Sequence, residues 1–321
     1  MATHRRADLG KVKTISIKRR KSKVTPADFA KVFDAARGSF VAFADSLPGI
    51  LVAKDLRTLV DDILDSRRKN KPVILMMGAH VIKVGLSPIL VDLIKNKVIT
   101  AVAMNSAAAI HDVETAMWGQ TSEDVAENIL DGRFGMARET GELINGALTD
   151  AFLGSDMGYG EALGRKLLDL GAPNAAVSLL ATCYTLNVPI TIHAAIGTYI
   201  IHQQPTMNGA ATGELSFRDF RTFAEVCKGL VGGGVVLNVG SAVIMPEVFL
   251  KALTVARNLG SRAKGFTTAV FDMNVHYRPL MNVKMRPTQD GGRGLYFTGH
   301  HEIMVPLLAA MVKARMSSER R

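Results

Sequence analysis

Short apolar runs of the kind that form buried strands recur along this chain, and glycines or polar residues follow each of them. Segments with helical periodicity separate the runs. Strands that are apolar on both faces are typical of parallel sheets covered by helices. The sequence therefore predicts a doubly wound, mostly parallel α/β sheet with helices on both faces. The clearest runs are 73–77, 98–104, 189–192, 266–271 and 295–298.

Strands and helices alternate from residue 73 onward. Before that point, Thr25-Pro26-Ala27-Asp28 combines an N-cap residue, a first-turn proline and an acid, which predicts a helix from 25 to about 37. The stretch 278–294 is expected to be irregular, a lid or binding loop, because it contains prolines, glycines and several basic residues. The other expected elements are strands 73–77, 98–104, 189–193, 234–239, 265–271 and 295–298, and helices 53–68, from 87, within 123–149, from 161, 174–186, 216–230, 246–259 and 301–315.

The positive charge of the chain is concentrated at its two ends. The net charge is +10, but residues 1–23 hold nine Lys or Arg and one Asp, so the body is close to neutral. The basic arm is either solvated or contacts phosphate or an acidic partner, and without a binding signature we expect no nucleic-acid partner. The expected segments are a basic flexible arm (1–24), an N-terminal helical extension (25–71), the α/β domain (72–315) and a basic tail (316–321).

The cysteines and the apolar segments bear on cellular location. Cys183 and Cys227 lie in apolar helical segments without CxxC spacing, and no secretory signal precedes them. They are expected to be reduced core residues of a cytoplasmic protein. The longest apolar stretches are interrupted before they could span a bilayer, so we expect no membrane segment.

Histidines follow the expected strands repeatedly. The carboxyl ends of parallel strands meet at one edge of a sheet, so seven of the eight histidines could share one cleft. No HxH or HExxH pattern accompanies them, and we expect no bound metal. The seven are His80, His111, His193, His202, His276, His300 and His301.

Two segments after strands could contact a ligand. Residues 105–114 place Asn, His and carboxylates at one strand end, although their acids could simply occupy the first turn of a helix. Gly240-Ser241 is either a ligand contact or a tight turn, whereas Gly232-Gly233-Gly234 precedes a strand and is therefore no dinucleotide fingerprint.

Lys83 and Lys284 are the lysines considered for imine formation with a substrate.

Five segments in register resemble deoxyhypusine synthase and its bacterial homologues. The resemblance implies a Rossmann-like domain with an N-terminal extension, a homotetramer, and NAD bound at the strand ends. The family oxidises spermidine with NAD, captures the aminobutyl group on a lysine as an imine, and passes it to an acceptor amine. The five segments are 77–86, 105–114, 188–198, 232–243 and 299–308.

The sequence departs from this family at several functional motifs. The catalytic lysine of a Trp-Gly-Lys motif has no counterpart in 291–296, and Gly299-His300-His301-Glu302 stands where the synthases have Ala-Asp-Ala-Ser. Gly197-Thr198-Tyr199 replaces an Asp-Gly-Ser turn, and Met245-Pro246-Glu247 replaces paired histidines. The resemblance therefore supports the predicted fold more strongly than the predicted reaction.

The resulting hypothesis is a deoxyhypusine synthase-like enzyme that transfers an aminoalkyl group from a polyamine or related small amine with NAD as cofactor. Two alternatives stay open: a hydrolase or lyase that uses a histidine-rich cleft without NAD and with or without a metal, and a non-catalytic binding protein that retains the fold. The expected catalytic residues are His111, Glu247, Lys284 and His300; the expected cofactor-binding residues are Gly78, His80, Gly85, Asn105, Ser106, Gly240, Ser241 and His301; and the expected substrate-binding residues are Asp112, Glu114, His193, Asp272, His276 and Glu302.

Overall fold

The structure, a computed structural model, describes residues 4–319 and divides into two compact units between Lys54 and Asp55. In the first unit, none of the short 3-10 turns buries a side chain. The predicted segment boundaries at 24/25 and 71/72 stay predictions. The elements of this unit are η1 (Leu9–Lys11), η2 (Ile17–Arg19), η3 (Pro26–Asp28) and α1 (Phe40–Ser46).

The prediction of a helix from 25 to about 37 is wrong. Only a single 3-10 turn forms, in which the Asp28 carboxylate accepts hydrogen bonds from the Thr25 N–H (2.9 Å) and hydroxyl (3.0 Å). The backbone becomes extended at Phe29, with φ −73° and ψ 149°. The capping residues that begin a helix are therefore present. A short helix also needs a packed apolar face to be stable, and the turn at Pro26–Asp28 buries no side chain.

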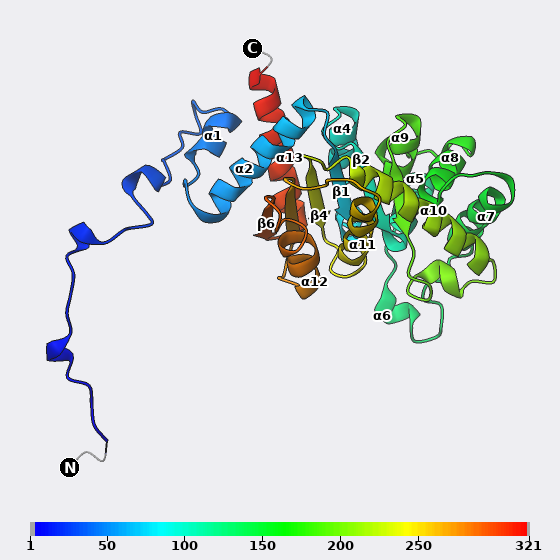
Figure 1. Ribbon diagram of the computed structural model, residues 1–321. Coiled ribbons are helices and arrows are strands. Elements are labelled where there is room, and N and C mark those ends of the chain that lie inside the picture. Colours follow the sequence, from blue (N-terminus) through cyan, green and yellow to red (C-terminus); the bar gives the residue numbers. More distant parts are fainter. Residues whose placement is uncertain (1–3, 320–321) are drawn as a thin grey trace. The chain divides into compact units, whose positions relative to one another are not determined.

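The second unit is built on a parallel sheet with strand order β3-β2-β1-β4-β5-β6 (Figure 1). Every neighbouring pair of strands is parallel. The order reverses direction between β1 and β4, as in Rossmann-like folds. This confirms the predicted fold class, and the strands are β1 (Val73–Met77), β2 (Ala101–Asn105), β3 (Ile190–His193), β4 (Val235–Val239), β5 (Thr267–Asp272) and β6 (Arg293–Thr298).

Helices cover the sheet on both faces. On one face, Phe223, Phe249 and Val283 pack into a core cluster with strand residues such as Ile74 and Val236. Helices α4 and α13 lie on the other side, where α13 contacts α4 and β5. The helices of this unit are α2 (Leu51–Arg68), α3 (His80–Lys83), α4 (Ser87–Lys95), α5 (Ser106–Trp118), α6 (Val125–Asn128), α7 (Arg138–Gly154), α8 (Tyr159–Asp169), η4 (Ala175–Val177), α9 (Leu179–Thr185), η5 (Ile200–Gln203), α10 (Gly209–Lys228), α11 (Ile244–Asn258), α12 (Tyr277–Pro279), the π-helix η6 (Leu280–Met285) and α13 (His301–Glu319).

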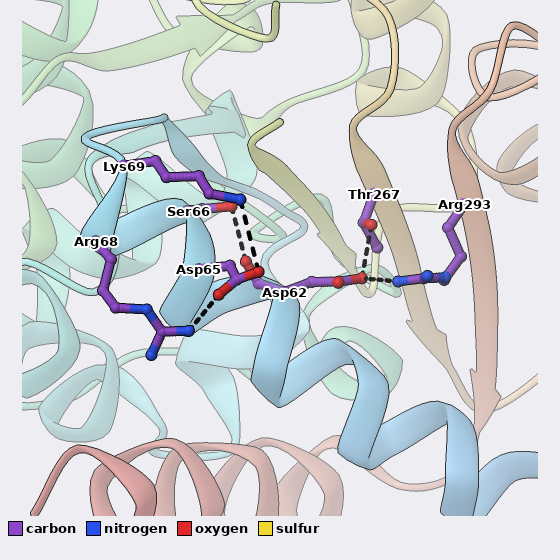
Figure 2. Close-up of polar contacts among 7 residues, drawn as sticks. All are labelled: Asp62, Asp65, Ser66, Arg68, Lys69, Thr267 and Arg293. Atoms are coloured by element: carbon purple, nitrogen blue, oxygen red, sulfur yellow. Dashed lines mark hydrogen bonds and ion pairs between the residues drawn. The ribbon is translucent and has the colours of Figure 1, made fainter. Parts of the chain in front are cut away.

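Helix α2 is fastened to the amino ends of two strands by one carboxylate. Asp62 accepts a hydrogen bond from the Thr267 hydroxyl (2.7 Å) and pairs with the Arg293 guanidinium (2.5 Å), as Figure 2 shows. One turn further, Asp65 pairs with Arg68 and with Lys69 (3.7 Å). The first residues of β5 and β6 are thus tied to the helix that precedes the whole sheet.

One expectation about an irregular segment needs correction. The stretch 278–294 is not a loop throughout, because η6 buries Asn282 and places Val283 in the core cluster. Core packing here overrides the composition of the segment.

The helices expected within 123–149 are α6 and α7. Gly132 (φ 78°) and Gly135 (φ 73°) adopt left-handed conformations between them.

Both cysteines are buried with free thiols, as expected for core residues. Within residues 4–319, no helix combines the length and the apolar character that crossing a membrane requires.

The turns after β1 and β4 approach each other so closely that only glycine fits. A Cβ atom added to Gly78 would lie 2.2 Å from the carbonyl oxygen of Gly240. Gly240 itself has a φ of 65°. The two central strands therefore meet backbone to backbone at their carboxyl ends.

This contact generates a stability prediction. Replacing Gly78 by alanine should lower the free energy of unfolding by about 1–3 kcal/mol, because the added methyl overlaps the Gly240 backbone. The matched control is Gly146→Ala in helix α7, where nothing lies within 4 Å of the added Cβ, and which should raise stability by up to about 1 kcal/mol. Urea denaturation measures both, and equal effects of the two substitutions would contradict the contact.

Candidate functional site

The structure brings five of the expected cofactor-binding residues together where the strand order reverses. Gly78 follows β1, and Gly240 with Ser241 follows β4. His80 begins α3 and His301 begins α13, and their ring centroids are 5.6 Å apart. Ligands of open α/β sheets bind beyond the carboxyl ends of the strands at such a switch point.

His301 is the most buried polar residue of this group, with 1% of its surface exposed. Its Nε2 lies 3.2 Å from the carbonyl oxygen of Phe271. The ring borders Gly240, where an added Cβ would be 3.1 Å away. Its Nδ1 is buried without a hydrogen-bond partner, which is rare for a polar atom and calls for an additional group.

A cavity of about 760 Å³ lies beside this point, beyond the carboxyl ends of β2 and β3. The short helix α3 borders both places, since His80 contacts His301 while Lys83 lines the cavity. The other walls come from α5, the segment after it, α7 and η5. The lining residues include Lys83, His111, Glu114, Trp118, Thr121, Glu123, Phe134, Glu139, Thr140 and Tyr199.

One hydrogen-bonded network forms the polar wall of the cavity. The His111 Nδ1 lies 2.5 Å from the Thr121 hydroxyl oxygen, and this hydroxyl also contacts Glu114 Oε2. The Thr140 hydroxyl donates to Glu114 Oε1 at 3.0 Å. The His111 Nδ1 and Glu114 Oε2 are themselves 3.6 Å apart. Both residues lie one turn apart on the same face of α5, which explains their meeting.

The network keeps Glu114 ionised despite its burial. Desolvation alone would raise the pKa of this carboxyl, but the contacts with His111, Thr121 and Thr140 together hold the pKa below its usual value. The cavity wall therefore presents a fixed negative charge.

Aromatic and acidic side chains complete the lining. Trp118, Phe134 and Tyr199 surround the space, and the carboxylates of Glu123 and Glu139 add to that of Glu114, against the single lysine Lys83. Carboxylates and aromatic faces both attract organic cations.

Asp112, predicted to bind substrate, does not line the cavity. It lies on the opposite side of α5, where its carboxylate accepts hydrogen bonds from the Ser178 hydroxyl (2.6 Å) and from the N–H groups of Leu179 (2.8 Å) and Leu180 (3.0 Å). These are the first residues of α9. Asp112 is thus a structural cap, and burial raises its pKa to about 6.

His193 also has a structural environment. It is 4% exposed at the end of β3, its Nε2 lies 3.0 Å from the Thr191 hydroxyl, and its ring packs against Phe223. Burial lowers its pKa to about 3. A neutral, enclosed imidazole of this kind is not available to a substrate.

Lys284, predicted to be catalytic, lies at the amino edge of the sheet, away from the cavity. It belongs to η6, and an added Cβ on Gly294 would be 2.8 Å from its Cγ. Gly294 is near the beginning of β6, at the amino edge. Lys83, at the carboxyl edge, is the lysine that lines the cavity.

The remaining expected residues occupy separate places. Asp272 pairs with His276 (3.6 Å) after β5, and exposed His300 pairs with Glu302 (3.7 Å) at the start of α13. Glu247 is held by Lys251, Arg278 (3.3 Å) and Asn282 (2.9 Å). No contact joins these groups to the cavity network, so the histidines do not converge in a single cleft.

The glycine and amide positions have local backbone roles. The Asn105 side chain accepts the Ala108 N–H (3.0 Å) as N-cap of α5, and Ser106 is the buried first residue of that helix. Gly85 adopts a φ of 78° between α3 and α4. The Ser241 hydroxyl accepts the Met245 N–H (3.2 Å) at the start of α11. Within residues 4–319, no three His, Cys, Asp or Glu side chains are grouped as metal ligands.

Sequence reasoning missed several cavity residues, among them Glu123, Phe134 and Glu139. Thr121 and Thr140 orient His111 and Glu114, while Trp118 and Tyr199 supply aromatic walls. A usable signal was the only tryptophan of the chain, placed directly before the polar segment 119–124. No local pattern indicates Thr140, which reaches Glu114 across 26 residues.

Comparisons with known proteins show the fold at low sequence identity. No family model and no curated protein sequence matches the chain. A solved structure of a protein proposed to be a deoxyhypusine synthase from Entamoeba histolytica aligns with a TM-score of 0.53 and 12% identity, over 88% of this chain and 96% of that one. A conserved protein proposed to be of the LOR/SDH class, from Methanococcus maripaludis S2, aligns with a TM-score of 0.51 and 13% identity, over 88% of this chain and 72% of that one.

A third similar structure is AgrE in a ternary complex with ornithine and NAD+. The TM-score is 0.54 at 13% identity, covering 83% of this chain and 33% of AgrE. This chain therefore spans about a third of the length of AgrE. The similarity shows a shared Rossmann-like α/β fold.

The burial of Asp112 generates a pH prediction. Because its folded pKa of about 6 exceeds the ordinary carboxyl value, its contribution to stability is complete below about pH 4 and is lost as the pH rises through about 6. The loss amounts to roughly 3 kcal/mol at about 1.4 kcal/mol per pKa unit.

Denaturant titrations of the wild type and of Asp112→Asn between pH 4 and 7 check this. The difference between the two free energies of unfolding should change by that amount across the window. A difference that is constant with pH would show that Asp112 titrates normally.

Proposed function

We propose that this chain is an enzyme that binds a small organic amine in the 760 Å³ cavity and oxidises it with NAD held at the switch point between β1 and β4. The observation that carries the proposal is the ionised, hydrogen-bonded Glu114 beside His111 in the cavity wall. In the finer form of the proposal, the reaction is an aminoalkyl transfer like that of deoxyhypusine synthase.

The residues that line the cavity indicate how an amine would be recognised. A protonated amine would meet the Glu114 carboxylate, with Glu123 and Glu139 further along the wall and the faces of Trp118 and Tyr199 around its alkyl chain. The side chain of Glu114 is 14% exposed, so a contact with it is strengthened by partial exclusion of water. A flexible diamine or polyamine suits a cavity of this size and charge.

His111 is the group placed to move a proton. Oxidation of an amine requires a neutral nitrogen, and imidazole accepts protons near neutral pH. The contact of Nδ1 with the Thr121 hydroxyl, itself bound to Glu114, fixes the ring orientation and leaves Nε2 as the free nitrogen. Glu114 would stabilise the protonated imidazole after transfer.

The switch-point residues fit a dinucleotide in two respects. Gly240 turns the chain toward the N-terminus of α11, a favourable position for a phosphate group, and the buried His301 leaves Nδ1 unpartnered beside Gly240. Gly78 is not an open loop glycine, since the Gly240 carbonyl occupies the space beside it. NAD bound there would supply a hydride acceptor for the carbon next to the amine nitrogen.

Lys83 replaces Lys284 as the lysine proposed for covalent transfer. A lysine amine that attacks the imine carbon of the oxidised substrate forms a new carbon–nitrogen bond and releases the leaving amine. Lys83 lines the cavity from α3, whereas Lys284 is at the other edge of the sheet. The expected homotetramer and cytoplasmic location stay predictions.

The amine site can be tested through Glu114. Spermidine binding, measured by calorimetry, should weaken about ten-fold or more in Glu114→Gln, because the variant loses a charge-assisted contact. The control Glu142→Gln removes an exposed charge from α7 outside the cavity and should bind like the wild type. Mixing spermidine and NAD with the wild type should produce NADH absorbance, and amine binding without NADH would remove the redox part of the proposal.

The lysine can be tested by trapping. Borohydride added during turnover with spermidine and NAD should attach the aminoalkyl group to Lys83, seen by peptide mass spectrometry. The label should persist in Lys284→Ala and disappear in Lys83→Ala. A label on Lys284, or none in the wild type, would refute the role of Lys83.

A further inference from the structure

A second cavity, of about 770 Å³, lies at the amino edge of the sheet, opposite the amine cavity. Pro72 and Thr100, which line it, immediately precede β1 and β2, and Val188 lies two residues before β3. The ends of four helices, α2, α4, α9 and α10, form the remaining walls. Nothing in the proposed oxidation uses this space.

Four cationic side chains line this cavity: Arg67, Lys71, Lys95 and Lys97. Within residues 4–319, no carboxylate forms an ion pair with any of them. The only acid in the lining, Glu225, is already paired with Lys228 at 2.5 Å. The cations therefore face the cavity without counter-charges from side chains.

Helix dipoles account for only part of this charge. Each helix C-terminus carries about half a negative elementary charge, so the four helix ends offset about two of the four positive charges. An excess of about two positive charges is left over. A single anion with two negative charges would balance it.

Two further details point to a ligand. The Nε of Arg67 is buried without a hydrogen-bond partner, so a donor in the wall lacks an acceptor. Lys97 adopts a left-handed conformation (φ 56°), as Asn70 (49°) and Asn187 (52°) do at the ends of two other helices. Asparagine and glycine enter this conformation more readily than lysine, so the position holds a cation where a neutral residue would be favoured.

We propose that this amino-edge cavity binds a small, doubly charged phosphate ester, with the phosphate among Arg67, Lys71, Lys95 and Lys97 and an apolar body against Leu186, Val188 and Val226. A cavity of about 770 Å³ has room for a small molecule, whereas a nucleic-acid backbone requires an extended basic surface. The site is independent of the amine cavity.

Calorimetric titration of the full chain with phenyl phosphate tests the proposal, at pH 8 and constant ionic strength. The wild type should bind one equivalent saturably. The double variant Lys95→Gln with Lys97→Gln should bind at least ten-fold more weakly, whereas the charge-preserving pair Lys95→Arg with Lys97→Arg should retain binding. Lys95 and Lys97 are exposed, so the fold is expected to tolerate both changes.

The basic arm provides the matched control. Lys18→Gln with Lys21→Gln removes the same charge from residues far along the chain and should leave the affinity within two-fold of the wild type. If this variant loses binding, or if the Lys95 and Lys97 double Gln variant binds like the wild type, the amino-edge site is overturned.

Discussion

The close approach of the Gly78 and Gly240 backbones is the constraint on which the rest of this structure depends. It joins the two central strands at their carboxyl ends, where the strand order reverses. The turn into α3 and the turn into α11 diverge from this contact, and His301 of α13 packs over it. Because α3 is only four residues long, Lys83 is carried directly from this point to the wall of the neighbouring cavity. A wider separation of the turns would displace all three helices.

The two edges of the sheet carry opposite chemistry. In a parallel α/β sheet, helix N-termini gather at the carboxyl edge and C-termini at the amino edge. At both edges, the side-chain charge is opposite in sign to the partial charge of the helix ends. Carboxylates line the cavity at the carboxyl edge, and lysines and an arginine line the cavity at the amino edge. At the amino edge, the positive side-chain charge is larger than the negative partial charge of the helix C-termini, so an anionic ligand would balance the excess.

The fold was predictable because it depends on local, repeated signals. Apolar runs such as Val73 to Met77 are buried on both faces, and the sheet they form has the expected parallel order. The site was predictable only in part. His111 and Glu114 share a helix face and could be found from spacing, whereas Thr140 joins them through tertiary structure. Asp112 and Lys284 lie away from the cavity, and sequence does not show which side of α5 faces it, or that η6 returns to the amino edge.

Helix α5 separates two tasks on its two sides. His111 and Glu114 face the cavity, while Asp112, between them in sequence, holds the first turn of α9 in the core. An exchange at 111 or 114 would alter the contents of the cavity and leave that anchor in place. Through neutral drift or selection, descendants of this chain could therefore acquire a different substrate without first passing through an unstable fold.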